Sequence, residues 1–158
     1  MSSPLHTLTI TELKKDDLTS FKDLILLFVQ VFEREDFSIP DSAHLEKLLK
    51  KDDFVVFCAQ VDGKVVGGLT VYIQEQYYST KPLAYIYDLA VEAQLQRQGI
   101  GKKLILAVNE YCQKHGFEEA YVPAEKEDHH AIDFYRSTKP TYEMDVIHFS
   151  YTLDQHKT

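Results

Sequence analysis

The sequence predicts a single α/β domain over residues 1–158, in which a mixed central β-sheet carries helices on both faces. Three observations predict this fold class. The chain has 158 residues, 44% of them hydrophobic and 27% charged, which is typical of one globular domain. Segments with the residue content of strands alternate with segments whose apolar residues recur every three or four positions, as in amphipathic helices. Their order along the chain is β-α-α-β-β-β-α-β-α-β-β.

The first half of the chain is predicted to contain two helices between strands. Residues 7–13 are rich in Thr, Leu and Ile and form the first strand. An apolar stripe at steps of three and four predicts a helix from Leu18 to near Arg34. A second short helix reaches about Lys50, and Asp41 or Ser42 can cap it.

A hairpin follows these helices. The run at 54–61 is β-branched and aromatic, and Asp62-Gly63 then offers a tight turn into a return strand at 65–74. Within the return strand, Gly67-Gly68 indicates a bulge or a close approach of the backbone to a neighbour.

The second half is predicted to form a βαβ unit and a C-terminal tail of strand character. Strand 83–91, helix 99–115 and strand 120–123 make the unit, and its two parallel strands should part around a ligand at their carboxyl ends. A helix capped by Asp128 stops before Pro140, and residues 142–153 alternate like a strand.

Charge and cysteine content exclude some classes of protein. The formal net charge of −8 argues against a nucleic-acid partner, because phosphate contacts need a surplus of Lys and Arg. Cys58 and Cys112 lie in apolar runs, which suits buried thiols in a reducing compartment. Residues 1–13 lack a signal-peptide pattern, and no apolar run approaches the roughly 20 residues that span a bilayer. We therefore expect a cytoplasmic protein that is not bound to a membrane.

The segment between strand 83–91 and helix 99–115 indicates an anion site. Its two glycines let the backbone approach a ligand, and the helix N-terminus favours negative charge, most simply a phosphate. Arg97, Lys102 and Lys103 crowd a helix end where cations are unfavourable unless an anion binds. The alternative is a solvated basic turn. A Walker loop would need Gly at position 96, and a dinucleotide fingerprint would need Gly at position 104, which are Gln and Leu here.

The six residues from Gln96 to Gly101 match the (Arg/Gln)-x-x-Gly-x-(Gly/Ala) motif of the GCN5-related N-acetyltransferase (GNAT) superfamily. The order of elements over nearly the whole chain resembles that family too. The resemblance implies a GNAT fold with a V-shaped cleft for acetyl-CoA between strands 83–91 and 120–123. The cofactor site that it implies consists of Leu89, Ala90, Val91, Gln96, Arg97, Gln98, Gly99, Ile100, Gly101, Lys102 and Tyr135.

Several further segments resemble the aminoglycoside 3-N-acetyltransferases. They are VFERED, YIYDLAV, QRQGIG, YVPAE, the helix with Ala131 and Tyr135, and IHF near the C-terminus. Four residues depart from that pattern: Asp128 replaces Asn, Lys139-Pro140 replaces Gly-Phe, and Ser150 replaces an acidic residue. These departures concern the acceptor side rather than the cofactor side.

Two residues are predicted to be catalytic. Tyr135 matches the family tyrosine that donates a proton to the departing thiolate, a role suited to a weakly acidic phenol; the alternative is a core aromatic residue. Asp88 interrupts an apolar strand, where a carboxylate is costly unless it is paired or faces a cleft. It could bind the acceptor ammonium and take its proton, or form an internal ion pair. A backbone N–H near Leu89 could stabilise the carbonyl oxygen.

The acceptor site is predicted to be acidic. Besides Asp88, its candidate residues are Glu33, Glu35, Asp36 and Glu125, although each could be an ordinary solvated acid. No histidine spacing indicates a metal site. The sequence thus predicts an acetyl-CoA-dependent N-acetyltransferase for a polycationic small molecule, with an aminoglycoside as the first candidate. The alternatives are polyamine, amino-acid or protein amines, or a non-catalytic CoA-binding sensor. The apolar C-terminal tail also suggests a homodimer.

Overall fold

A computed structural model of the chain describes residues 7–154, which fall into two compact units with a boundary between Pro123 and Ala124. The first unit contains the sheet and most of the helices. Its elements are β1 (Leu8–Glu12), α1 (Leu18–Val31), α2 (Ser42–Leu49), β2 (Phe54–Val61), β3 (Lys64–Gln74), β4 (Leu83–Val91), the 3-10 turn Ala93–Leu95, α3 (Ile100–Lys114) and β5 (Glu119–Tyr121). The second unit contains α4 (His129–Ser137) and the segment that follows it.

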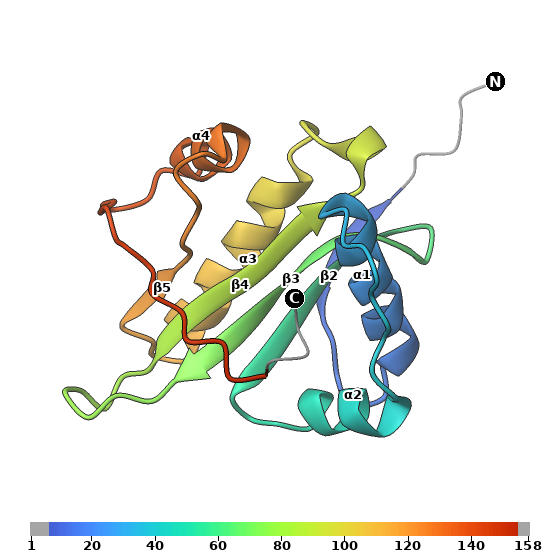
Figure 1. The fold of residues 1–158 in the computed structure, drawn as a ribbon, viewed down its shortest axis with the longest axis horizontal. Coiled ribbons are helices and arrows are strands. Elements are labelled where there is room, and N and C mark those ends of the chain that lie inside the picture. Colours follow the sequence, from blue (N-terminus) through green and yellow to red (C-terminus); the bar gives the residue numbers. More distant parts are fainter. Residues whose placement is uncertain (1–6, 155–158) are drawn as a thin grey trace. The chain divides into compact units, whose positions relative to one another are not determined.

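The five strands form one sheet in the order β1-β2-β3-β4-β5 (Figure 1). Neighbouring strands are antiparallel except for β4 and β5, which run parallel as expected for the two strands of a βαβ unit. The α/β class, the mixed sheet and the order of elements up to the last helix are therefore confirmed. Most predicted boundaries agree with the observed ones to within one or two residues.

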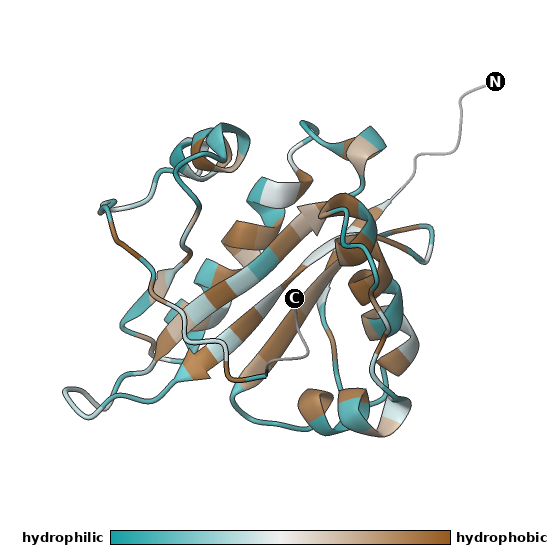
Figure 2. Cartoon of the chain, viewed as in Figure 1, coloured by the Kyte–Doolittle hydropathy of each residue, from teal (hydrophilic) through white to brown (hydrophobic). Residues whose placement is uncertain are grey.

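Helices cover both faces of this sheet, because the side chains of a strand alternate between its faces. On β2, Phe54, Val56 and Cys58 belong to a core cluster shared with α1 and α2. Phe57, between them, instead places its ring 5.9 Å from that of Tyr111 on α3. Apolar residues are concentrated in α1 and β2, as Figure 2 shows. Most residues of β2 are buried, because this strand lies between the two helical layers.

The glycine pair in β3 marks a close approach, as predicted. A Cβ atom at Gly68 would lie 2.6 Å from a methyl carbon of Leu24 and 2.6 Å from the carbonyl oxygen of Phe57. Only glycine therefore lets α1 pack this closely on the centre of the sheet. This contact fixes the helix above the half of the sheet that holds the candidate site.

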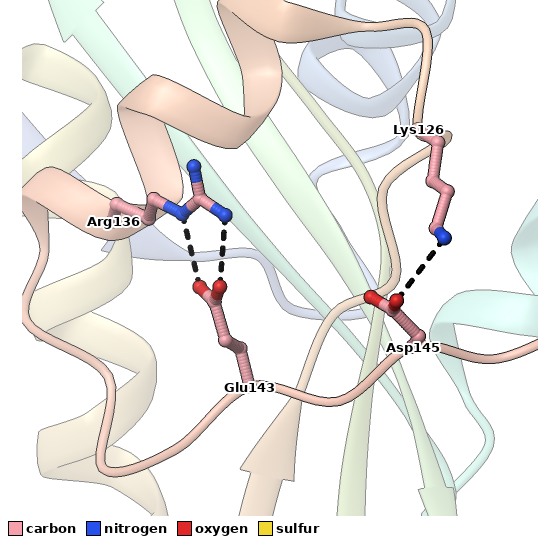
Figure 3. Close-up of polar contacts among 4 residues, drawn as sticks. All are labelled: Lys126, Arg136, Glu143 and Asp145. Atoms are coloured by element: carbon pink, nitrogen blue, oxygen red, sulfur yellow. Dashed lines mark hydrogen bonds and ion pairs between the residues drawn. The ribbon is translucent and has the colours of Figure 1, made fainter.

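The second unit is organised by a capped helix and two ion pairs. Asp128 caps α4 as predicted, since its Oδ1 accepts a hydrogen bond of 3.0 Å from the Ala131 N–H. Arg136 donates two hydrogen bonds, of 3.0 and 2.8 Å, to the carboxylate of Glu143. Lys126 forms a 3.1 Å ion pair with Asp145 (Figure 3). These exposed pairs tie the C-terminal segment to α4 and to the residues before it.

The predicted C-terminal strands are wrong. Residues 142–154 contain no helix or strand, and their large apolar side chains are exposed. A strand needs a neighbouring strand for its backbone hydrogen bonds, and alternation of side chains cannot supply one. The described part of the second unit contains no strand with which this segment could pair. The first helix also ends earlier than predicted, at Val31, because Glu33 takes a left-handed φ of 51°.

Candidate active site

A bulge in β4 determines where the candidate site lies. Leu69 of β3 pairs with Leu89, and Val71 pairs with Ile86, so Tyr87 and Asp88 both lie opposite the single residue Thr70. A regular strand would turn these two side chains to opposite faces of the sheet. The bulge removes that alternation, and both side chains line the same cavity.

The cavity lies between the sheet and the α1–α2 region and has a volume of about 210 Å³. Aromatic and aliphatic side chains form most of its wall, with a few polar groups, as is usual for sites that bind small molecules. The residues that line it are Phe21, Ile25, Phe28, Val29, Arg34, Phe37, Pro40, His44, Leu45, Leu48, Phe54, Thr70, Tyr72, Tyr87 and Asp88.

Among the described residues of the cavity wall, Asp88 is the acidic one, and Arg34 carries the opposite charge. Burial raises the pKa of the Asp88 carboxyl above its usual value, and the positive charge of Arg34 partly offsets this. A carboxylate with a raised pKa is a stronger base than a solvated one. It also gains more from an incoming cation, because it has lost part of its hydration. The sequence predicts that a carboxylate in this strand is either paired or faces a cleft, and in the structure Asp88 lines the cavity together with the oppositely charged Arg34.

The two parallel strands part beyond their first residues. β4 and β5 are paired from Leu83 and Glu119 to Tyr85 and Tyr121, where β5 ends. β4 continues for six residues to Val91, and on that side its backbone pairs with no strand in the described first unit. Leu89, Ala90 and Val91 lie in this open part, as the predicted V-shaped cleft requires.

The loop from Gln96 to Lys102 has the geometry of an anion site. Gly99 precedes α3 with a left-handed φ of 86°, and no side chain caps the helix. By contrast, Asp41 caps α2 through the His44 N–H, and Asp128 caps α4. A Cβ at Gly99 would have no atom within 4 Å, so the space beside this residue is open. The first amides of α3 are available to a ligand phosphate.

The first residue of the motif has a role that the sequence did not show. The side chain of Gln96 donates a hydrogen bond of 3.0 Å to the carbonyl oxygen of Val91, the last residue of β4. It therefore holds the loop to the end of the strand. Arg97 takes a left-handed φ of 65° and is exposed.

Three of the predicted acceptor residues lie outside the cavity wall. Glu33, Glu35 and Asp36 are exposed in the α1–α2 loop, although Arg34 and Phe37 of the same loop line the cavity. Glu125 and Tyr135 belong to the second unit, where Glu125 is exposed and the Tyr135 ring lies 5.0 Å from that of Phe134. The roles of these five residues stay predictions.

Sequence reasoning missed Arg34, His44 and Tyr72 as cavity residues. They come from a loop, a helix and a strand that are far apart in the sequence, so no local motif contains them. The one available signal was Tyr72, a large aromatic residue two positions before the end of a strand.

The two cysteines are buried free thiols, as predicted. Burial raises the pKa of Cys58 to about 12 and that of Cys112 to about 11, so neither is a thiolate nucleophile at neutral pH. Between residues 7 and 154, no three His, Cys, Asp or Glu side chains are grouped closely enough to hold a metal ion. No helix of this same range has both the length and the apolar character to cross a membrane.

Comparison with solved structures finds strong likeness over the whole fold. The chain is 60% identical, with a TM-score of 0.92, to the aminoglycoside acetyltransferase meta-AAC0020 from an uncultured soil metagenomic sample, solved with trehalose; 93% of this chain and 97% of that one are covered. The same protein was solved with sisomicin. Another soil metagenomic aminoglycoside acetyltransferase, HMB0005, is 29% identical with a TM-score of 0.87, covering 94% of this chain and 99% of that one.

Comparison of sequences also matches the chain to acetyltransferases. The chain is 28% identical over 137 residues to an uncharacterized N-acetyltransferase of Methanocaldococcus jannaschii, a match that covers 84% of this chain and 60% of that protein. The chain thus spans less than two thirds of the length of this curated relative. Residues 19–138 match the model of the Acetyltransferase (GNAT) family. The bulged β4, the parting of β4 and β5 and the open N-terminus of α3 therefore belong to a member of the GNAT family of acetyltransferases.

Proposed function

We propose that this protein is an acetyl-CoA-dependent N-acetyltransferase whose acceptor is a primary amine of an aminoglycoside. The observation that carries the proposal is the cavity in which Asp88, with its raised pKa, lies among aromatic side chains. A relative that is about 60% identical is an aminoglycoside acetyltransferase, solved in complex with trehalose and with sisomicin. The proposal takes residues 1–158 as one catalytic domain, since the family match extends across both units.

The loop and the open part of β4 fit acetyl-CoA. The uncapped first amides of α3 and the left-handed Gly99 would hold its pyrophosphate, while Arg97, Lys102 and Lys103 supply positive charge. The backbone of Leu89 to Val91 offers hydrogen-bonding groups to the pantetheine arm. When bound, acetyl-CoA supplies the acetyl group as a thioester.

Asp88 is proposed to bind the acceptor amine and to remove its proton. An aminoglycoside amine is mostly protonated at neutral pH, and a protonated amine cannot act as a nucleophile. The Asp88 carboxylate would bind the ammonium group and take its proton, directly or through a water molecule, leaving a neutral amine in the cavity. Tyr72 and Tyr87 offer aromatic surface around this position.

Tyr135 is proposed to give a proton to the thiolate that leaves. Replacing it in Tyr135→Phe removes only the hydroxyl, and we expect kcat to fall about 10²-fold, the lower end for loss of a general acid. Tyr151→Phe is the matched control, because Tyr151 is 86% exposed in the same unit. Unchanged kcat in Tyr135→Phe would remove Tyr135 from the mechanism.

The central experiment is a CoA-thiol release assay with sisomicin, with a polyamine and with a lysine-containing peptide. We expect rapid release with sisomicin, and NMR of the product identifies which amine is acetylated, the 3-amine being the predicted one. Release with the polyamine or the peptide alone would identify a different acceptor class. Acetyl-CoA binding without release by any amine would show a sensor instead of an enzyme.

Two cellular expectations belong to this proposal. Expression in an aminoglycoside-sensitive bacterium should raise the inhibitory concentration of sisomicin, because acetylation removes a positive charge from the drug. Cytoplasmic location is consistent with the two free, buried thiols. A homodimer stays a prediction that sedimentation tests.

A further inference from the structure

A row of tyrosines crosses the sheet next to the cavity. Tyr72 on β3 is the direct partner of Tyr85 on β4, and Tyr85 is the direct partner of Tyr121 on β5. Residues directly opposite each other across neighbouring strands lie on the same face of a sheet. The three rings, called the tyrosine row below, therefore stand side by side on the face that also carries the cavity residue Phe54, the partner of Tyr72 on β2.

The row is held together by ring contacts. The rings of Tyr85 and Tyr121 are stacked, with centroids 5.0 Å apart and planes 8° apart. Tyr72 and Tyr85 are 6.5 Å apart, and Tyr87 meets each of them edge-on, at 5.6 and 5.8 Å. At the far end, the Tyr121 hydroxyl donates a hydrogen bond of 2.8 Å to Oε1 of Gln74, which fixes that ring. The row is thus a continuous aromatic surface.

The row is continuous with the cavity that holds Asp88. Tyr72 and Tyr87 line the cavity and are 41% and 53% exposed. Tyr85 and Tyr121, which are half-buried, extend the aromatic surface from Tyr72 beyond the cavity wall. Burial raises the pKa of Tyr72 and Tyr85, and the neighbouring Tyr87 and the carboxylate of Asp88 raise it further. The phenols therefore stay protonated at neutral pH and can donate hydrogen bonds.

We propose that the tyrosine row is a second subsite of the acceptor site, which binds the outer rings of a cationic, several-ringed amino sugar while the reacting amine lies at Asp88. This inference rests on the proposed function and names the part of the substrate that the cavity cannot hold. A cavity of about 210 Å³ is below the usual volume of pockets that enclose drug-sized ligands. The rest of such a substrate must lie against a neighbouring surface.

The chemistry of the row suits this occupant. Amino sugars present apolar C–H faces edged by hydroxyl and ammonium groups, and tyrosine offers ring surface together with a hydroxyl. Aromatic rings also attract ammonium groups. Glu119 lies two residues before Tyr121 on β5, so its side chain is on the same face of the sheet as the row.

The test compares a three-ring acceptor, sisomicin, with the single-ring diamine 2-deoxystreptamine that forms its core. In Tyr85→Leu/Tyr121→Leu, we expect KM for sisomicin to rise about tenfold, while KM for 2-deoxystreptamine and for acetyl-CoA stays within twofold. Tyr111→Leu is the matched control, because it removes a tyrosine with comparable ring contacts, to Phe57 and Phe117, on the other face of the sheet. It should leave both acceptor KM values unchanged.

A second measurement covers the case in which the double variant does not fold. In wild-type protein with ¹³C-labelled tyrosine rings, sisomicin should shift the Tyr85 and Tyr121 ring signals, and 2-deoxystreptamine should not. Equal changes in KM for both acceptors, or absent shifts with sisomicin, would overturn the subsite while leaving the acetyltransferase in place. If the wild type neither binds nor acetylates sisomicin, the proposed function and the subsite both fail.

Discussion

Two regions of the first unit present different groups to a ligand, one of them backbone amides and the other side chains. At the carboxyl end of β4, the loop from Gln96 to Lys102 presents backbone amides, and its shape depends on one left-handed glycine and one side-chain hydrogen bond. Around the middle of β4, the cavity is built of side chains from α1, the α1–α2 loop, α2 and three strands. The loop needs only a short stretch of sequence, whereas the cavity needs the whole fold. Substitutions should therefore act differently in the two regions.

The largest loss of activity is expected from a substitution in the cavity. Asp88→Asn removes the base and the negative charge that binds the acceptor, so kcat/KM for the amine should fall by about 10²- to 10⁴-fold. The dissociation constant of CoA, measured by calorimetry, should not change, because the loop lies elsewhere. Asp53→Asn is the control, since Asp53 is an exposed residue paired with Lys51. A loss of CoA affinity in Asp88→Asn would contradict the separation of the two regions.

The same variant should not lose stability at neutral pH. Burial raises the pKa of Asp88 in the folded protein, so the folded state holds this proton more tightly than the unfolded state does. Stability from this group is present at low pH and is lost as the pH rises through the folded pKa. The neutral amide avoids that loss. We expect Tm at pH 7 to be equal to or above that of the wild type, as differential scanning calorimetry can show.

A smaller effect is expected in the loop. Gly99→Ala places a side chain at φ 86°, which costs about 1–2 kcal/mol for a left-handed L-residue. Gly63→Ala is a matched control, because Gly63 has φ 79° and, like Gly99, open space around its Cβ position. Both variants should lose comparable stability, but only Gly99→Ala should weaken CoA binding, by up to about tenfold. Equal CoA affinities in the two variants would mean that the loop does not bind the cofactor.

The loop could be predicted from the sequence because its determinants are local. Gly99 and Gly101 between a strand and a helix indicate an anion site whatever surrounds them, and the boundaries of α3 follow from an apolar stripe. Of the cavity residues, Asp88 could be predicted because it is conspicuous in an apolar strand. Arg34, His44 and Tyr72 become neighbours only when α1, α2 and β3 pack together. The bulge that turns Tyr87 and Asp88 to one face leaves no mark in the sequence, since ordinary strand residues form it.

The C-terminal prediction failed for a related reason. The alternating run from Val146 to Leu153 has the residue pattern of a strand, but a strand also depends on a partner for its backbone. The alternation of apolar and polar residues indicates which face of a segment can be buried, but it does not indicate which strand lies beside that segment. The prediction of β5 succeeded because its partner, β4, is fixed by the helix that connects them.

A still smaller effect is expected where the loop meets β4. Gln96→Ala removes the hydrogen bond to the Val91 carbonyl, which contributes about 0.5–1.5 kcal/mol when intact. CoA affinity should fall about threefold, because the loop amides lose their fixed position relative to the strand, while the acceptor KM stays constant. Gln94→Ala, at an exposed position two residues away, is the control. An acceptor KM that rises with the CoA dissociation constant would show that the two regions are coupled through β4.

The smallest effect concerns the charge that faces Asp88 in the cavity. The Arg34 guanidinium lowers the pKa of the Asp88 carboxyl against the larger effect of burial, so Arg34→Gln should raise that pKa further. The acid limb of the kcat/KM profile, where Asp88 becomes protonated, should then move to higher pH. Lys50→Gln, at the end of α2 and outside the cavity wall, should leave the limb in place. Saturation of the enzyme with CoA should not alter the shift, because the loop charges lie in the other region. An acid limb that does not move in Arg34→Gln would show that the base titrating there is not Asp88, and the cavity would then have to be assigned a different catalytic group.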